Sequence, residues 1–566
     1  MKNKELLHER RDFENVRALI EWAGDEYAGK TLFSWRDSIK AEKSTVTFDA
    51  FRDEVRALAT KLRDMGVTGK NCVLIGKMTY EWALVYYSVL SAGGVLVPLD
   101  RDWTAPELAK TAKKADVAFL FCDADIEEKS KVIVEETGLE APVIYLRGKN
   151  STEADSLAAL VGQGRELYSG NPELYSAPAI DNSVTALIVF TSGTTGEGKG
   201  VMLPQRAFIS DLSSIIPYID FSEKSVSVLP PHHTYGSSVM LIGHVMIGSE
   251  VYISAGLRYI QKELELEKPG HLILVPLYLE TFYRKIFAKA KDGGKDKVLR
   301  RMIKVSNALR KIGIDLRSVF FKSVRAAFGG NVTMVISGGA PINSEIIHFF
   351  EAVGISTLNG YGITECAPII AVNRSRRNKF GTVGPVLDIC DVKIDSPNEA
   401  GEGEIWVKGP NVMLGYYKNE EATAAAFSED GYFKTGDYGR LDGDVITITG
   451  RKKNLIILSN GKNVYPEEIE SDLIATPGVI DIIVYEGQSR RGMEHNAIVA
   501  EIYPDKDFME KNGITDVKAY LQKYIEQYNK TAIAYKKIGV LKVRDEEFPK
   551  NTLRKILRFK LDMSID

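Results

Sequence analysis

A run of glycines and small hydroxyl residues, ending in a lysine, occupies positions 191–199. Glycine permits positive φ and close approach of the backbone, and successive exposed N–H groups in such a loop form a concavity that holds anions. The hydroxyl groups add donors, and Lys199 adds a positive charge. A flexible Gly/Ser turn is the plainer alternative, but the density of donors and the final lysine favour a polyphosphate cradle. Its candidate ligands are Thr191, Ser192, Gly193, Thr194, Thr195, Gly196 and Lys199.

The same segment nearly matches the nucleotide-binding pattern G-x-x-x-x-G-K-[ST]. Gly193, Gly198 and Lys199 fit this pattern. The next residue is Gly200, which has no hydroxyl to offer to Mg²⁺. A kinase-like or switch NTPase is therefore disfavoured, and a metal ligand is expected elsewhere in the chain.

Alternating helices and strands are predicted to position this loop. The strands are predicted at 72–76, 95–98, 117–121 and 184–190. The helices are predicted at 48–65, 80–92 and 105–114. Strands that alternate with helices in this way indicate βαβ units and a parallel sheet. The segment 150–181 is rich in Ser, Gly, Asn and Pro, and we expect it to be an exposed connection before the loop.

Two more strands are predicted to end in glycine-rich turns. The strand at 332–336 runs into Gly338, and the strand at 355–358 runs into Gly360. Open α/β sheets bind their ligands at the carboxyl ends of the strands. We therefore expect these two strand ends and the loop near residue 193 to converge on one crevice.

The downstream part of the chain changes character twice. Short strands and turns predict a small β-rich subdomain at about residues 381–450. From residue 466 the order helix, strand, strand, helix, strand predicts a compact α+β unit, whose length of about 110 residues is usual for a domain. The predicted fold class is α/β, with a large N-terminal domain of parallel-rich βαβ sheets, the β-rich subdomain, and a small α+β unit at the C-terminus.

The composition is that of an ordinary globular protein. With 566 residues, the chain is too long for a single core. Its net charge of −3 gives no reason to expect nucleic-acid binding. The four cysteines form no metal-binding pattern, which favours a reducing, cytoplasmic setting. We find no apolar core of a signal peptide in the first thirty residues, no apolar run long enough to span a membrane, and no HExxH motif of a zinc hydrolase.

The segment 284–325 is strongly basic, with fourteen Lys or Arg residues against three Asp. A solvated helical face is the plainer interpretation. The alternative is a face that approaches anionic membrane lipid or the phosphates of a ligand. Peripheral membrane contact therefore stays open beside the cytoplasmic setting.

Taken together, residues 45–560 resemble the adenylate-forming superfamily, which includes acyl-CoA synthetases, luciferases and the adenylation domains of peptide synthetases. The resemblance is carried, in the family's order, by the loop at 191–200, by Tyr361-Gly-Ile-Thr-Glu365, by Gly436-Asp437, by Gly450-Arg451 and by the segment around Lys555. Two positions differ: Gly198 stands where the family usually has Pro, and Arg554 stands where it often has Gly.

The resemblance implies a role for each matching residue. In the cradle, residues 191–199 would hold the β- and γ-phosphates of ATP. Gly339 and Ala340 would line the adenine, and Tyr361, flanked by Gly360 and Gly362, would stack on it. Thr364 would contact the α-phosphate and Glu365 would bind Mg²⁺. Asp437 would take the ribose hydroxyls, with Arg451 reaching ribose or phosphate. His233 would lie near the acyl carboxylate, and Lys555 would be the lysine needed for adenylation.

Each of these residues also has a structural alternative. Tyr361 could be a core aromatic, Glu365 a carboxylate at a helix N-terminus, and Asp437 a turn residue. Arg451 and Lys555 could be surface cations, and a satisfied structural histidine is a fair alternative for His232 or His233. The resemblance also implies a division into residues 1–452 and a mobile C-terminal domain, 453–566, with a hinge at Lys453.

The resemblance predicts ATP-dependent activation of a carboxylic acid to acyl-AMP, followed by transfer to coenzyme A. ATP, Mg²⁺ and coenzyme A are the expected cofactors. The stretch 230–330 looks most like that of long-chain fatty acid–CoA ligases. Three alternatives remain: loading onto the phosphopantetheine of an acyl carrier protein, ligation of an aromatic or other acid, and a silent binding module. The last is disfavoured because Lys199, Glu365, Asp437 and Lys555 are all present. The oligomeric state is left open.

Overall fold

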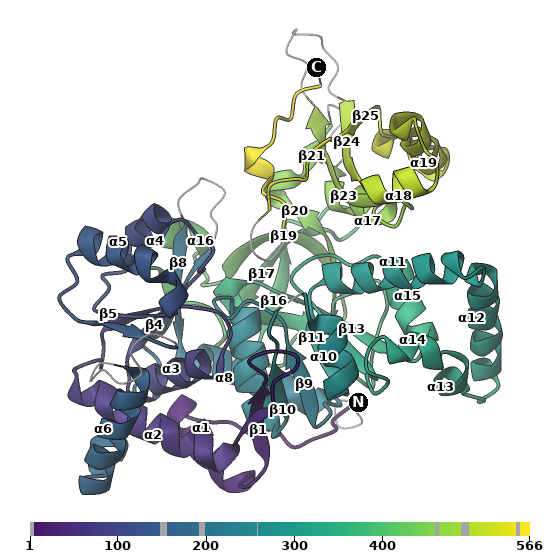
Figure 1. The fold of residues 1–566 in the computed structure, drawn as a ribbon. Coiled ribbons are helices and arrows are strands. Elements are labelled where there is room, and N and C mark those ends of the chain that lie inside the picture. The colour runs from purple at the N-terminus through teal and green to yellow at the C-terminus, as the bar shows by residue number, and fades with distance from the viewer. Residues whose placement is uncertain are drawn as a thin grey trace.

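The computed structural model describes residues 5–147, 156–191, 198–256, 258–458, 463–487, 497–550 and 555–565. Figure 1 shows an α/β body and a smaller C-terminal part that lies above it in this view. Five expected cradle residues lie outside the described residues: Ser192, Gly193, Thr194, Thr195 and Gly196. No helix in the described ranges is long and apolar enough to cross a membrane.

A seven-stranded sheet forms one side of the body. Its spatial order is β18 (Gly415–Tyr416), β8 (Lys199–Pro204), β7 (Thr185–Thr191), β4 (Val95–Leu99), β3 (Asn71–Ile75), β5 (Phe119–Cys122) and β6 (Val143–Tyr145). From β7 to β6 the neighbouring strands are parallel, whereas β8 is antiparallel to both β7 and β18. The accompanying helices are α1 (Val16–Glu26), α2 (Phe48–Asp64), α3 (Tyr80–Ser91), α4 (Ala105–Lys114) and α5 (Glu127–Thr137). The predicted α/β class with parallel strands is confirmed.

Helix α4 shows how local sequence sets an element. The Thr104 hydroxyl accepts from the Glu107 N–H at 3.4 Å, and the Glu107 carboxylate accepts from the Thr104 N–H at 2.9 Å. This capping box satisfies two backbone donors that the start of a helix leaves unpaired. The predicted range 105–114 is confirmed.

The loop after β7 is shorter than predicted. Lys199 and Gly200 were expected in the loop from composition, but both belong to β8, where they pair with Thr191 and Phe190. Pairing with β7 satisfies backbone groups that a loop would leave to water. A Cβ at Gly200 would come within 3.0–3.2 Å of Ile188 and Phe190, so packing accounts for the glycine at this position.

The connection predicted at 150–181 is not wholly irregular, because it contains α6 (Leu157–Gly170) and α7 (Glu173–Ser176). Helix α6 packs closely on α2: a Cβ at Gly164 would lie 2.0 Å from the carbonyl oxygen of Ala57. The small residues that suggested a loop therefore allow two helix backbones to approach one another. This tertiary contact has no local signature in the sequence.

A second sheet contains β11 (His271–Leu274), β12 (Met334–Ser337), β13 (Ser356–Gly362) and β14 (Ile369–Val372), in that order. The first three strands are parallel and β14 is antiparallel. The turn after β12 lies against β13, since a Cβ on Gly338 would be 3.7 Å from the oxygen of Gly360. Two of the three glycine-rich strand ends thus adjoin within one sheet, while β7 belongs to the other.

A third sheet has the order β2 (Ser44–Thr47), β1 (Thr31–Trp35), β10 (Glu250–Ile253) and β9 (Lys224–Ser227). The helices of this region are α8 (Gln205–Ile215), a π-helical segment (Tyr235–Ile242), α9 (Gly243–Ile247) and α10 (Ile260–Glu267). The basic segment folds into α11 (Pro276–Asp292), α12 (Asp296–Lys311), α13 (Arg317–Phe320) and α14 (Lys322–Ala326), and α15 (Ser344–Ala352) follows β12.

The β-rich region forms a five-stranded sheet. Its order is β15 (Gly384–Pro385), β20 (Val445–Arg451), β19 (Phe433–Asp442), β17 (Gly403–Lys408) and β16 (Asp391–Asp395), with α16 (Glu420–Ala426) beside it. All of its strand pairs are antiparallel. This matches the predicted β character of the region.

The C-terminal part has its own hydrophobic cluster, whose buried residues all lie between Ile456 and Leu541. Its elements are β21 (Ile456–Ile457), β22 (Asn463–Val464), α17 (Pro466–Leu473), β23 (Val479–Gly487), β24 (Ala497–Pro504), α18 (Lys506–Lys511), α19 (Val517–Thr531) and β25 (Val540–Val543). In Figure 1 this part lies above β19, β20 and α11.

Candidate active site

Three strands bring a carboxylate, a phenol and a guanidinium together. Asp437 of β19 pairs in register with Arg451 of β20, and Arg451 Nε lies 3.0 Å from Asp437 Oδ1. The Tyr361 hydroxyl, from β13, donates to Asp437 Oδ2 at 2.9 Å. Burial raises the pKa of Asp437, and the charge of Arg451 opposes that rise. Because each carboxylate oxygen has more than one lone pair, Asp437 can still accept hydrogen bonds from the hydroxyls of a ligand.

Glu365 lies in the turn after β13 and is linked to the other sheet through Tyr416. The Tyr416 hydroxyl donates to Glu365 Oε1 at 3.0 Å, and Lys199 Nζ lies 4.7 Å from the centre of the Tyr416 ring. Burial raises the pKa of Glu365. Tyr416 therefore touches both the predicted phosphate-binding lysine and the predicted metal ligand.

A buried polar network holds the backbone around Glu365. The Met413 N–H donates to the Glu365 carbonyl at 2.8 Å. The Asn411 side-chain amide donates to the Ile369 carbonyl at 2.9 Å, and Asp211 Oδ2 accepts from the Ile369 N–H at 3.0 Å. Buried hydrogen bonds of this kind restrict the turn to one arrangement.

Lys555 approaches this group from the C-terminal part. Desolvation, reinforced by Arg451 and Lys453 and opposed by Asp437, lowers the pKa of Lys555 to about 8. Its charge in turn acts on Asp437 and on His233. Although neighbouring groups displace much of the water around the ammonium, the residue as a whole keeps an exposed surface that a ligand can reach. The described residues of the two parts of the chain thus share one electrostatic site.

His233 occupies the loop between β9 and the π-helical segment Tyr235–Ile242, within range of the charge of Lys555. Burial is the main cause that lowers the pKa of His233 to about 3, and His232 and Lys555 add to it. The imidazole is therefore neutral near pH 7 and can donate or accept a hydrogen bond, but it supplies no positive charge. The adjacent His232 has its Nε2 3.7 Å from Asp100 Oδ2, at the end of β4.

The predicted adenine-lining residues Gly339 and Ala340 follow the end of β12. Gly339 has a positive φ of 87°, and both Gly339 and Ala340 are exposed. Gly362 is more constrained, because a Cβ there would lie 1.8 Å from the carbonyl oxygen of Pro368. Thr364 is buried. The backbone around Tyr361 therefore requires small residues for steric reasons.

Only the ends of the cradle can be described. The Thr191 hydroxyl donates to the Lys199 carbonyl at 3.4 Å. Lys114 Nζ, from the end of α4, donates to the Gly198 carbonyl at 3.0 Å. Lys114 thus brings a second ammonium group to the end of the cradle, which the sequence pattern did not indicate.

The donor set around Glu365 fits Mg²⁺ that arrives with a nucleotide. In the parts of the chain that the structure describes, no group of three or more His, Cys, Asp or Glu residues could hold a metal ion. Mg²⁺ commonly binds through one or two carboxylates together with substrate phosphates and water. One carboxylate, with Oε1 already held by Tyr416, is therefore a sufficient protein contribution.

Sequence reasoning missed three residues that the structure adds to the site. Tyr416, Asn411 and Asp211 come from segments that carry no glycine-rich strand end and no chemical motif. The Gly415-Tyr416-Tyr417 run was the only signal available for Tyr416, and nothing in its spacing relates it to Glu365. Their roles follow from contacts between sheets.

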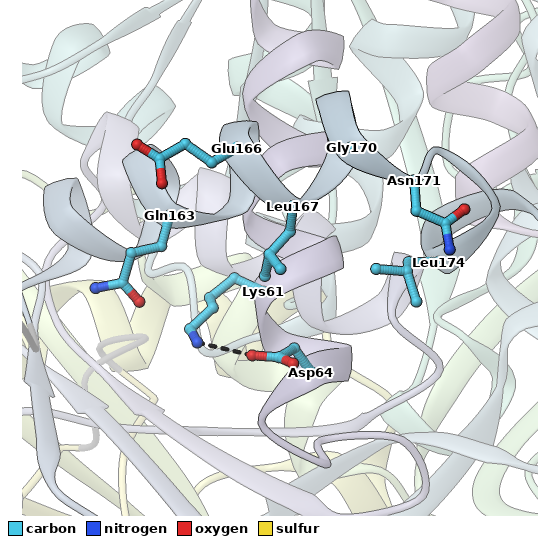
Figure 2. Close-up of a pocket in the computed structure, with 8 residues that line it drawn as sticks. All are labelled: Lys61, Asp64, Gln163, Glu166, Leu167, Gly170, Asn171 and Leu174. Carbon is cyan, nitrogen blue, oxygen red and sulfur yellow. Dashed lines mark hydrogen bonds and ion pairs between the residues drawn. The ribbon is translucent and has the colours of Figure 1, made fainter.

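A surface depression of about 520 Å³ lies between α2, α6 and α7 (Figure 2). In Figure 2, Lys61 points toward Asp64, and their ion pair measures 2.8 Å. None of the predicted site residues lines this depression; its lining residues are Lys61, Asp64, Gln163, Glu166, Leu167, Gly170, Asn171 and Leu174. We assign it no part in catalysis.

Comparison with known proteins gives a consistent family. The family described as AMP-binding enzyme matches residues 20–417. The long-chain-fatty-acid–CoA ligase FadD15 of Mycobacterium bovis is 29% identical over 465 residues, covering 78% of this chain and 75% of that protein. The chloroplastic long-chain-fatty-acid–[acyl-carrier-protein] ligase AEE15 of Arabidopsis thaliana is 27% identical over 536 residues, covering 82% of this chain and 72% of that protein.

Among solved structures, the ATP-bound MatB of Rhodopseudomonas palustris has a similar fold. The TM-score is 0.74 at 23% identity, with 96% of this chain and 97% of that chain covered. The similarity shows a shared fold over nearly the whole length, including the C-terminal part.

Proposed function

Because this chain belongs to the family of AMP-binding enzymes, we propose that it activates a carboxylic acid with ATP and transfers the acyl group to a thiol. One observation carries the proposal: groups suited to a nucleotide, its phosphates and a metal are linked to one another by contacts and electrostatic interactions. They are Lys199, Tyr361, Glu365, Asp437, Arg451 and Lys555.

In the first step a carboxylate oxygen attacks the α-phosphorus of ATP. The new O–P bond gives acyl-AMP, and the bond to the leaving pyrophosphate breaks with its electron pair. Since an anion approaches an anion, the barrier is lowered by positioning and by cations aimed at the phosphates. We assign Lys199 and Lys555 to this task, and His233 to a hydrogen bond with the acyl carboxylate. Bound Mg²⁺, held by Glu365, would neutralise phosphate charge.

The remaining residues bind the nucleoside and α-phosphate. Tyr361 offers its partly exposed ring to adenine, which Gly339 and Ala340 border. Asp437 accepts from the ribose hydroxyls while Arg451 holds the carboxylate in place. We assign Thr364 to the α-phosphate.

In the second step a thiol attacks the acyl carbonyl of acyl-AMP. The C–S bond forms as the thiol loses its proton to solvent, the C–O bond to AMP breaks, and AMP leaves with the electron pair of that bond. Lys555 is then no longer needed, so we propose that residues 453–566 rotate away about Lys453. The turn at Lys452–Asn454 directly follows β20 and supports this choice of hinge.

We propose a medium- or long-chain fatty acid as the acid and coenzyme A as the thiol. Support comes from the relative FadD15, named as a long-chain-fatty-acid–CoA ligase. An apolar binding site would gain about 0.8 kcal/mol for each buried methylene. We propose that the enzyme is cytoplasmic. Because such acids partition into bilayers, we also propose that it collects its acid at a membrane surface.

A carrier-protein phosphopantetheine is the second candidate for the thiol. The relative AEE15, named as an acyl-carrier-protein ligase, favours this alternative at similar identity. Coenzyme A and the carrier protein present the same kind of thiol to the acyl group. They differ in the rest of the molecule, which would bind outside the active site.

Pyrophosphate release across a panel of carboxylic acids of increasing chain length tests the function. We expect acid-dependent release with ATP and Mg²⁺, strongest for medium or long chains, and thioester formation when coenzyme A is added. Thioester formed only with a carrier protein would select the second candidate. No release with any acid would reject adenylation.

The Lys555→Ala variant separates the two steps. Removing one aligned donor costs about 2.7–4 kcal/mol in other enzymes, or roughly a hundredfold or more in rate. We expect that loss in pyrophosphate release, whereas thioester formation from preformed acyl-AMP should persist. Equal loss in both steps would reject the proposal that Lys555 acts only in adenylation.

A further inference from the structure

Helix α12 has one broad apolar face, as a surface helix usually does, but the fold covers only part of it. On the covered side Leu299 is buried and Met302 packs against the same hydrophobic cluster. On the outer side Val298, Val305 and the C-cap residue Ile312 are 53%, 45% and 71% exposed. These three recur every seven residues, a spacing that places them on one side of the helix.

Cations flank this outer line. Between residues 297 and 314 the chain has six Lys or Arg residues and no Asp or Glu. Lys297, Arg301, Lys304 and Lys311 are exposed, and none of their side chains makes a hydrogen bond or ion pair with another residue in the described ranges. We call Val298, Val305, Ile312 and these four cations the outer face of α12. Within the part of the chain that the structure describes, no ion pair neutralises the charge of this face.

The outer face stands at the margin of the molecule. Figure 1 shows α12 at the right-hand edge, joined to the body through α11 and α13. The exposed apolar line continues beyond the helix to Ile314 and Val319, which are 44% and 68% exposed. The nearest following acid, Asp315, is paired with Arg317 at 2.7 Å.

We propose that the outer face of α12 docks this protein on an anionic lipid bilayer. A surface helix with exposed aliphatic side chains beside lysines and arginines fits the plane of the headgroups, where cations meet lipid phosphates and aliphatic groups enter the acyl boundary. The core of a protein–protein interface, in contrast, is depleted of charge and built on aromatic anchors. The docking rests on the proposed function in one respect: a membrane-bound enzyme would find its fatty acid substrate in the bilayer.

Flotation of the full chain with phosphatidylcholine vesicles, with and without phosphatidylglycerol, tests the docking. We expect binding only when phosphatidylglycerol is present, and weaker binding at high salt. The triple variant Arg301→Gln/Lys304→Gln/Lys311→Gln should lose roughly fivefold in binding per cation. The matched control Lys518→Gln/Lys523→Gln/Lys530→Gln changes the same charge on the exposed side of α19 and should bind like the unmodified protein.

A second variant tests the apolar contribution. Val298→Ser/Val305→Ser/Ile312→Ser should remove the part of the binding that survives high salt, while Val184→Ser, at a 52% exposed position elsewhere, should not. Urea midpoints of all variants should equal that of the unmodified protein, because the changed side chains face outward.

Several results would overturn the proposal. These are equal binding to neutral and anionic vesicles, equal loss in the α19 control, capture of an acidic carrier protein but not of vesicles, or a changed oligomeric state as the sole effect. Thioester formation from a water-soluble acid should be the same in all these variants. Absence of vesicle binding with intact activity would therefore reject the docking alone, and vesicle binding without activity would reject the proposed function alone.

Discussion

The charge of Lys555 is expected to change within the working range of the enzyme. Its pKa is lowered to about 8, chiefly by desolvation, so the ammonium is charged below that pH and neutral above it. The ratio kcat/KM for ATP reports on the free enzyme. Measured by pyrophosphate release, we expect it to fall about tenfold per pH unit above the pKa of Lys555.

The variant Lys555→Arg is the matched test of that assignment. A guanidinium stays charged throughout this range, so the alkaline decrease should disappear even if the maximal rate is lower. If the decrease persists in the arginine variant, another group causes it.

Tyr416 is expected to govern the dependence on Mg²⁺. In Tyr416→Phe the ring below Lys199 remains, but the hydrogen bond to Glu365 Oε1 is lost. The pKa of Glu365, already raised by burial, should rise further. We expect the Mg²⁺ concentration for half-maximal pyrophosphate release to rise about tenfold, as for partner groups of other metal ligands.

The variant Tyr416→Leu provides the comparison. It removes both the hydroxyl and the ring. Lys199 then loses its contact with the ring, so we expect KM for ATP to rise as well as the Mg²⁺ requirement. Unchanged Mg²⁺ dependence in Tyr416→Phe would show that the hydroxyl does not matter to the metal site.

At the level of elements, the sequence predicted helices and strands that depend on local signals. It did not predict features that depend on contacts between elements. Helix α4 was predictable because its cap and its apolar period lie within one stretch. Helix α6 was not predictable, because the reason for a glycine at position 164 is its close contact with Ala57 of α2. The same holds for the site: strand ends at Gly338 and Gly360 could be found from the sequence, whereas Tyr416 enters only through the pairing of β18 with β8.

The short turn at Lys452–Asn454 is the element on which the proposed rotation depends. In Lys453→Pro the backbone angle φ is restricted, so we expect the thioester step to slow more than pyrophosphate release. The variant Lys453→Ala removes the charge without restricting φ and should affect the two steps similarly. Equal slowing of both steps by proline would place the hinge elsewhere.

At the scale of the whole molecule, the contacts between α11 and the C-terminal part are polar. Arg284 donates to the Val479 carbonyl at 3.0 Å, Lys291 to Asn512 at 2.6 Å, and Lys511 lies 2.8 Å from Asp292. Exposed ion pairs contribute little, about 0–1 kcal/mol each. These contacts at α11 would therefore oppose the proposed rotation only weakly.

Stability of the whole chain should depend on pH through a buried histidine pair. His244 Nε2 lies 2.9 Å from His271 Nε2, and both side chains are fully buried. Desolvation lowers the pKa of His244 to about 4 and holds that of His271 well below its usual value. Since the folded state resists protonation, stability is complete above the unfolded pKa and is lost as the pH falls from about 6.5 toward the folded pKa.

The loss should be about 2 kcal/mol at pH 5 for His244 alone. Urea midpoints at pH 7.5 and 5 would measure it: the difference between the two pH values should shrink in His244→Gln, whatever that variant does at neutral pH. The exposed control His8→Gln should leave the difference unchanged. If the difference between the two urea midpoints does not shrink in His244→Gln, the histidine pair is not the cause of the loss of stability at low pH.

The antiparallel pairing of β7 with β8 has a consequence for how pyrophosphate can be released. In nucleotide sites where a strand leads through the loop into a helix, the helix N-terminus supplies permanent positive potential. Here the chain continues as strand β8, and we assign part of the positive potential to a side chain, Lys555, which belongs to a part of the chain joined by a short turn. Under the proposed rotation, the attraction of Lys555 for pyrophosphate would be withdrawn after the first reaction without any unfolding. One movement would then both release pyrophosphate and prepare the site for the second reaction.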